Sequence, residues 1–149
     1  MKKFILLILI LTSFLAEAQQ VEYKVVTSIE SIIPAGIGRS RIISEEDKLN
    51  YEDFTTERTD GKKSKQGNVK RGDAKIEKFE ETKLLNFFSL AGINFQNIAS
   101  NDALISDKIN KMVAQGWELS FVVSGVESDA GKGDGQGIFI TRYIFKRTL

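Results

Sequence analysis

The 149-residue sequence contains no cysteine, no histidine and only one proline. Without cysteine the chain cannot form disulfides or use thiol chemistry, and without histidine it lacks the commonest general base and the usual zinc ligands. Its 21 Lys and Arg residues almost balance its 20 Asp and Glu residues. Because a nucleic-acid-binding domain normally carries a clear basic excess, this balance argues against nucleic acid as a partner.

The first 18 residues follow the three-part pattern of a secretory signal peptide. A basic start is followed by an apolar run over residues 4–15, and small residues stand at Ala16 and Ala18. As a helix the apolar run reaches only about 18 Å, which is too short for a hydrocarbon core of roughly 30 Å. We therefore expect residues 1–18 to be a cleaved leader and residues 19–149 to form a single exported domain, periplasmic or secreted. No later apolar run is long enough to predict a transmembrane segment after cleavage.

The first half of the expected domain is predicted to be mostly extended. Residues 21–29 alternate with period two and are rich in β-branched side chains, which predicts a strand with one buried face. A bend at 32–38 leads to a short strand around residues 39–44. Residues 76–91 fit either a helix or a buried strand, and residues 93–98 are predicted to be extended.

The last third contains the clearest pattern. Apolar residues recur at helical spacing from about residue 102 to residue 115, after a capping segment at 100–102 and before Gly116. Trp117 then opens a strand, and its apolar environment predicts that it packs beneath the helix. A glycine-rich loop, residues 125–137, leads to a strand at 138–147 that is apolar on both faces and therefore central. We predict an α+β fold, an antiparallel β-sheet with one main helix packed on one face.

Three short motifs support this layout. The sequence reads EYKVV at 22–26, GWEL at 116–119 and RYIFKR at 142–147. In this order they resemble the small bacterial domains grouped as domain-of-unknown-function family 4177, which read strand, helix, strand, strand. The resemblance implies a core at 21–29 and 101–147 and a long insertion at 30–100. It implies no activity, because the family has none that could be carried over.

Two segments contain candidate binding residues. Arg39, Ser40 and Arg41 follow two glycines, so backbone N–H groups and guanidinium forks could meet a carboxylate or phosphate there; the alternative is a turn followed by solvated arginines. In the glycine-rich loop, Lys132 and Asp134 are the candidates for contact with a partner. That loop matches neither a Walker loop nor a dinucleotide or calcium loop, so glycine there indicates backbone freedom.

The sequence contains no recognisable catalytic grouping, because its acidic residues stand in runs within polar segments. We expect a non-catalytic interaction module of the bacterial cell envelope, without cofactor or metal, that binds a protein, a glycan or another envelope component. An edge strand of the predicted sheet could also mediate self-association. The alternative is a small carboxylate-dependent hydrolase that acts on envelope polysaccharide.

Overall fold

The computed structural model describes residues 20–31, 39–89, 91–127 and 137–149. Several sequence predictions concern segments that lie outside the described residues: the signal peptide, the bend at 32–38, and the loop residues Lys132 and Asp134.

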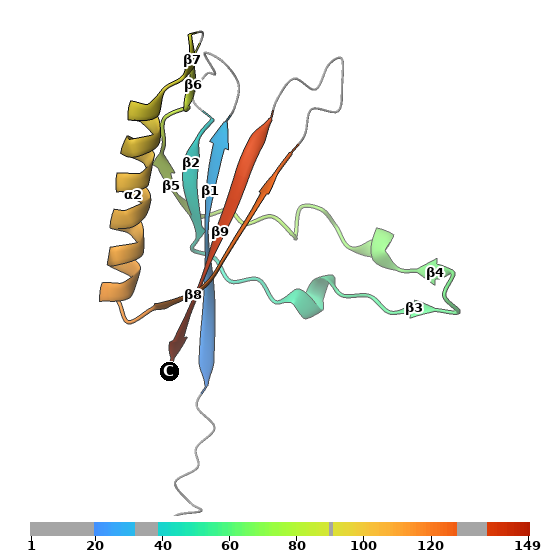
Figure 1. Ribbon diagram of the computed structural model, residues 1–149. Helices are drawn as coiled ribbons and strands as arrows, with labels where there is room; N and C mark the ends of the chain where they lie inside the picture. The colour runs from blue at the N-terminus through green and yellow to red at the C-terminus, as the bar shows by residue number, and fades with distance from the viewer. Residues whose placement is uncertain (1–19, 32–38, 90, 128–136) are drawn as a thin grey trace, which may run out of the picture.

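A five-stranded antiparallel sheet and one long helix form the body of the protein (Figure 1). The helix α2 (Phe95–Ala114) covers one face of the sheet, which confirms the predicted α+β class. The strand order is β5-β2-β1-β9-β8. The strands are β1 (Val21–Ser31), β2 (Arg41–Glu45), β5 (Phe79–Lys83), β8 (Glu118–Val126) and β9 (Ile138–Thr148). As predicted, β8 and β9 form a hairpin, and β9 lies inside the sheet between β1 and β8.

The helix begins earlier than the sequence predicted. It starts at Phe95, so the predicted extended segment at 93–98 is confirmed only for Ile93 and Asn94 and wrong for residues 95–98, and the predicted cap at 100–102 lies inside the helix. The physical reason is that the Asn94 side chain accepts a hydrogen bond from the Asn97 N–H at 3.2 Å and caps the helix there. The predicted end is confirmed, because Gly116 has a φ of 85°, the left-handed conformation of a helix terminus.

The side chains of β1 alternate between two faces, and the face that is buried carries fewer apolar residues than the other. Val26 and Ser28 point towards α2 and are almost fully buried, whereas Tyr23 on the opposite face is 61% exposed. Burial in β1 therefore follows the position of the strand in the fold and not its hydrophobicity alone.

The core lies between α2 and the sheet. Its buried apolar members are Val26, Ile42, Leu84, Met112, Trp117 and Phe145. The predicted packing of Trp117 beneath the helix is thus confirmed. The Arg147 guanidinium carbon lies 4.4 Å from the centre of the Trp117 ring, a cation–π geometry that covers the outer edge of the core.

A long excursion separates β2 from β5 and extends away from the sheet (Figure 1). We call residues 46–78 the arm. It contains the short elements η1 (Tyr51–Phe54), β3 (Arg58–Thr59), β4 (Lys63–Ser64) and η2 (Gln66–Asn68). After the arm come β5 and the short pair β6 (Phe88–Ser89) and β7 (Gly92–Ile93). The described part of the ambiguous segment 76–91 is therefore not a helix; it contains β5 and β6, and residues 84–87 between them have no regular secondary structure. The stretch expected as an insertion therefore supplies two strands of the main sheet and the first turns of the helix.

Candidate functional site

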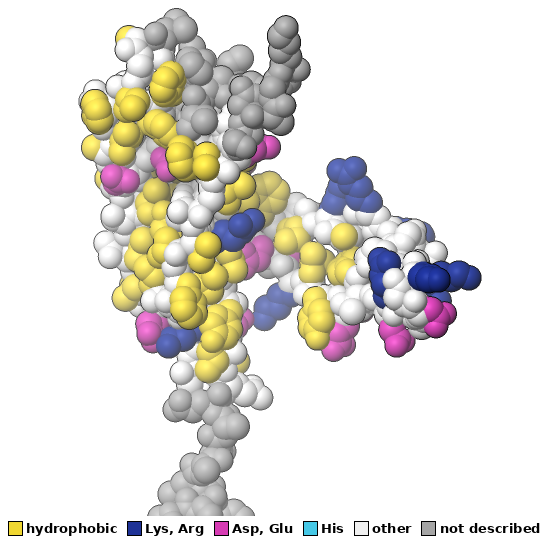
Figure 2. Space-filling model, turned by 45° about the vertical axis from the view of Figure 1, so that its right-hand side comes forward, with side chains coloured by type: hydrophobic (Ala, Val, Ile, Leu, Met, Phe, Trp, Pro, Cys, Tyr) yellow, Lys and Arg dark blue, Asp and Glu magenta, His cyan; other side chains and the backbone are white. Residues whose placement is uncertain are grey.

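The face of the sheet opposite α2, which we call the open face, is rich in apolar side chains. Register partners on neighbouring strands point to the same face of the sheet. On the open face, Val25 lies beside Ile144 and Thr27 beside Ile43. Figure 2 shows hydrophobic side chains gathered over this surface, next to the arm. An exposed apolar patch can mark an interaction site or a ligand-binding groove.

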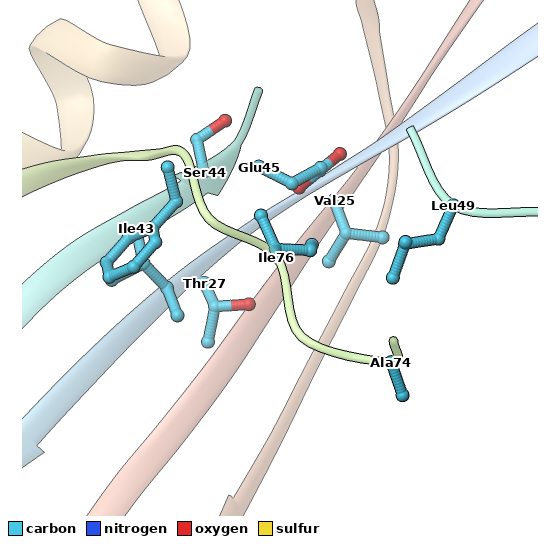
Figure 3. Close-up of a pocket in the computed structure, with 9 residues that line it drawn as sticks. Val25, Thr27, Ile43, Ser44, Glu45, Leu49, Ala74 and Ile76 are labelled. Carbon is cyan, nitrogen blue, oxygen red and sulfur yellow. The ribbon is translucent and has the colours of Figure 1, made fainter. Parts of the chain in front are cut away.

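A pocket of about 430 Å³ lies where the arm returns to the open face. Its apolar lining comes from β1, β2, β5 and the arm: Val25, Thr27, Ile43, Leu49, Ala74, Ile76 and Phe79. Figure 3 shows Val25 and Thr27 of β1 and Ile43 of β2 beside Ile76 of the arm, with Leu49 beyond Val25. The size falls in the range of pockets that hold small ligands.

Hydrogen bonds at the base of the arm hold the pocket walls in place. The Asp47 carboxylate accepts hydrogen bonds from the N–H groups of Glu77 and Lys78, at 3.2 and 2.9 Å. The Glu46 N–H donates to the Lys78 carbonyl at 3.3 Å. The two ends of the arm are therefore tied together directly beside the strands that line the pocket.

A charged cluster lies at the start of β1, on the helix side of the sheet. Nε and Nη2 of Arg147 both donate to the same oxygen of Glu22, at 3.0 and 2.8 Å. Lys48, from the arm, lies 3.5 Å from the other oxygen. The hydrogen bonds from Arg147, helped by the charges of Arg147 and Lys48, lower the pKa of Glu22 despite the opposing effect of its partial desolvation. Glu22 is thus held as a carboxylate that fixes Arg147 over Trp117.

The structure separates the three predicted anion-binding residues. Ser40 is buried, and its hydroxyl accepts from the Ser31 N–H at 2.9 Å and donates to Asn86 at 2.6 Å. Arg41 forms an ion pair with Glu81, and its Nε donates to the Arg39 carbonyl at 3.2 Å. An anion at Arg41 would therefore have to compete with Glu81, while the Ser40 hydroxyl serves the packing of the strands.

Three of the acidic residues available to a hydrolase, Asp47, Glu80 and Glu81, have structural partners. Glu80 lies 2.6 Å from Lys108 of α2, and this hydrogen bond lowers the pKa of Glu80. A general acid requires the opposite shift, towards neutral pH. Asp47 is occupied by backbone N–H groups and Glu81 by Arg41. Across the described ranges, no three acidic residues come close enough together to form a metal site.

Sequence reasoning missed the pocket. The alternation at residues 21–29 predicts one buried face, whereas β1 uses both faces. A signal was available, because Val25 and Val26 are adjacent, so both faces of β1 carry a β-branched apolar side chain. The contribution of Leu49 and Ile76 from the polar arm follows only from how the arm folds back.

Comparisons with protein-family models, with curated proteins and with solved structures each found no match to this chain. No helix in the parts of the chain that the structure describes is both long and apolar enough to cross a membrane.

Proposed function

We propose that this protein is a non-catalytic binding module, exported to the cell envelope, which takes an uncharged hydrocarbon group into the pocket on its open face. The observation that carries the proposal is the lining of the pocket. Five of its residues are Val, Ile or Leu side chains or a phenyl ring, drawn from three strands and the arm: Val25, Ile43, Leu49, Ile76 and Phe79. Burying such surface against a hydrocarbon chain is worth roughly 0.8 kcal/mol for each methylene group.

The chemistry of the pocket favours hydrocarbon over sugar or peptide. Sugars are bound through several converging polar groups, whereas most of the side chains that line this pocket are aliphatic or aromatic. Glu45 is the one charged residue among those that line the pocket. The leader-like N-terminal sequence supports an envelope location, where the acyl chains of lipids are abundant. An apolar small molecule would present the same hydrocarbon surface to the pocket as an acyl chain.

Binding can be measured with the environment-sensitive probe N-phenyl-1-naphthylamine, displaced by decanol. We expect saturable fluorescence enhancement that decanol reverses. Leu49→Lys places an ammonium group at the pocket wall and should weaken probe binding by about tenfold or more, because a charge is costly to desolvate. The matched control is Leu104→Lys on α2, since Leu104 and Leu49 are similarly exposed, at 40% and 46%. This control should bind as the wild type does.

A second pair of variants separates loss of the pocket from loss of the fold. Thr27→Lys should abolish binding, and Thr27→Val should preserve or strengthen it, because valine has almost the shape of threonine without its hydroxyl. Thermal melting and circular dichroism check that both variants fold. Absence of saturable binding to the wild type, or equal binding by Leu49→Lys and Leu104→Lys, contradicts the proposal.

A further inference from the structure

The two edges of the sheet differ in charge. β5, at one edge, carries Glu80, Glu81 and Lys83, and its acids bind Lys108 and Arg41. β8, at the other edge, has no charged residue after Glu118, and every residue from 121 to 126 is exposed. Natural sheets protect their edges with charges, prolines or covering segments because an open edge pairs with other strands. Only the β5 edge has such protection by charge.

In addition to its open edge, β8 carries apolar side chains on both faces of the sheet. Phe121 and Val123 lie on the open face, and Val122 and Val126 lie on the helix side. Val122 is 53% exposed, so α2, which contacts β8, leaves this part of the strand uncovered. A strand that pairs with β8 must therefore carry apolar side chains on both of its faces and no charged residue in the paired segment.

We infer that β8 pairs with β8 of a second copy, antiparallel, about a two-fold axis near Val123. A second copy of β8 is such a strand, because it is uncharged from Leu119 to Val126 and carries apolar side chains on both faces. The axis places Val123 opposite Val123 of the copy and Phe121 opposite Gly125 of the copy, where the phenyl ring covers the strand position that lacks a side chain. Within residues 121–125 no like charges meet, because this segment contains no charged residue.

The strand geometry permits this register. The one irregularity in the pairing of β8 with β9 lies between Leu119 and Phe121, so residues 121–126 form a regular ladder. The two sheets would join into one sheet of ten strands, with the two open faces on the same side. Residues 121–126 are all exposed, so each helix leaves the strand uncovered around the axis.

The oligomeric state tests the inference. Sedimentation equilibrium of the wild-type protein over a concentration series should show a monomer–dimer equilibrium. Val122→Lys should raise the dimer Kd by about tenfold or more, because two ammonium groups are brought near the axis. Adding Ser124→Glu in the same chain should restore most of the affinity, since residues 122 and 124 are opposite one another in this register. Val113→Lys on α2, whose side chain is also 53% exposed, is the matched control.

Cysteine substitution tests the axis directly, because the chain contains no cysteine of its own. Under mild oxidation Val123→Cys should form a covalent dimer at least about tenfold faster than Val113→Cys, as opposed Cβ atoms in a sheet lie within disulfide reach. The inference is overturned if the wild type stays monomeric throughout the series, or if Val113→Lys weakens association as much as Val122→Lys. It is also overturned if Val123→Cys and Val113→Cys cross-link equally.

Discussion

Asn101, in the middle of α2, makes with the main chain of Leu85 the two hydrogen bonds that a neighbouring strand would make. Its Oδ1 accepts from the Leu85 N–H at 2.8 Å, and its Nδ2 donates to the Leu85 carbonyl at 2.7 Å. The same Nδ2 donates to Glu30 of β1 at 2.8 Å. Asn101 is fully buried, so one side chain joins the helix, the segment after β5 and the first strand.

Replacing this amide should destabilise the protein through lost hydrogen bonds. Asn101→Leu keeps the approximate volume but leaves the Leu85 main-chain groups and Glu30 without this partner. We expect a loss of about 1–3 kcal/mol in the free energy of unfolding, measured by urea denaturation. Asn110→Leu, at an exposed position of the same helix, is the control and should change stability by less than about 0.5 kcal/mol. Equal losses in the two variants would show that the bridge contributes little.

Truncating the centre of the core should have the largest single effect. Phe145 has no exposed surface and packs with Val26, Ile42 and Trp117. Phe145→Ala should lower the free energy of unfolding by about 3–5 kcal/mol, because it removes apolar contacts and leaves a cavity. Phe139→Ala on the same strand, where the side chain is 40% exposed, should cost clearly less. Denaturant unfolding of both variants tests this order.

Stability should fall in acid partly through Glu22. Because Arg147 lowers the pKa of Glu22 in the folded state, the folded state binds fewer protons there than the unfolded state. This contribution is complete above the ordinary glutamate pKa of about 4.3, and it is lost as the pH falls through the lower folded pKa. Glu22→Gln should therefore reduce the acid-induced drop in Tm, measured from neutral pH downwards. Glu57→Gln on the arm should keep the wild-type drop, and an unchanged profile for Glu22→Gln would contradict the assignment.

The turn from α2 into β8 should depend on the backbone conformation of Gly116. Its φ of 85° is one that residues with a Cβ atom adopt at a cost, although the space around it is open. Gly116→Ala should therefore destabilise the protein by about 1 kcal/mol through strain, and Gly116→Asn should cost less. Gly67→Ala on the arm, where φ is not positive, should be close to neutral. Thermal melts of the three variants test the order, and equal effects of Ala at both positions would exclude strain as the cause.

The sequence predicted the last third of the fold well because there the local signals agree. Helical spacing, the glycine at 116 and the alternation after Trp117 all describe the same helix–strand–strand unit, and the structure confirms it. The start of the helix was missed because Asn94 caps it while Phe95 and Ile98 also fit an extended segment. A cap is a single hydrogen bond, and the sequence offered a second plausible cap at 100–102.

Beyond the apolar side chains on both faces of β1, the pocket could not be predicted, because it depends on contacts between segments far apart in the sequence. Ile76 reaches Val25 and Ile43 only after the arm has left the sheet and returned to it. The ion pair of Arg41 with Glu81 is likewise a consequence of β2–β5 pairing. Arg39, Ser40 and Arg41 were selected as neighbours in the chain, but alternation in and around a strand directs the Ser40 and Arg41 side chains to opposite sides.

The attachment of the arm also bears on how freely its length can change. Glu45 and Phe79 are register partners, so the whole arm is the loop of one β-hairpin whose two ends are closed by the sheet itself. Doubling the length of such a loop costs only about 0.6 kcal/mol of closure entropy. The distal part, around β3 and β4, could therefore be shortened, extended or replaced by a foreign sequence without disturbing the strands at its base. This makes the tip a natural place to insert a label or an affinity tag.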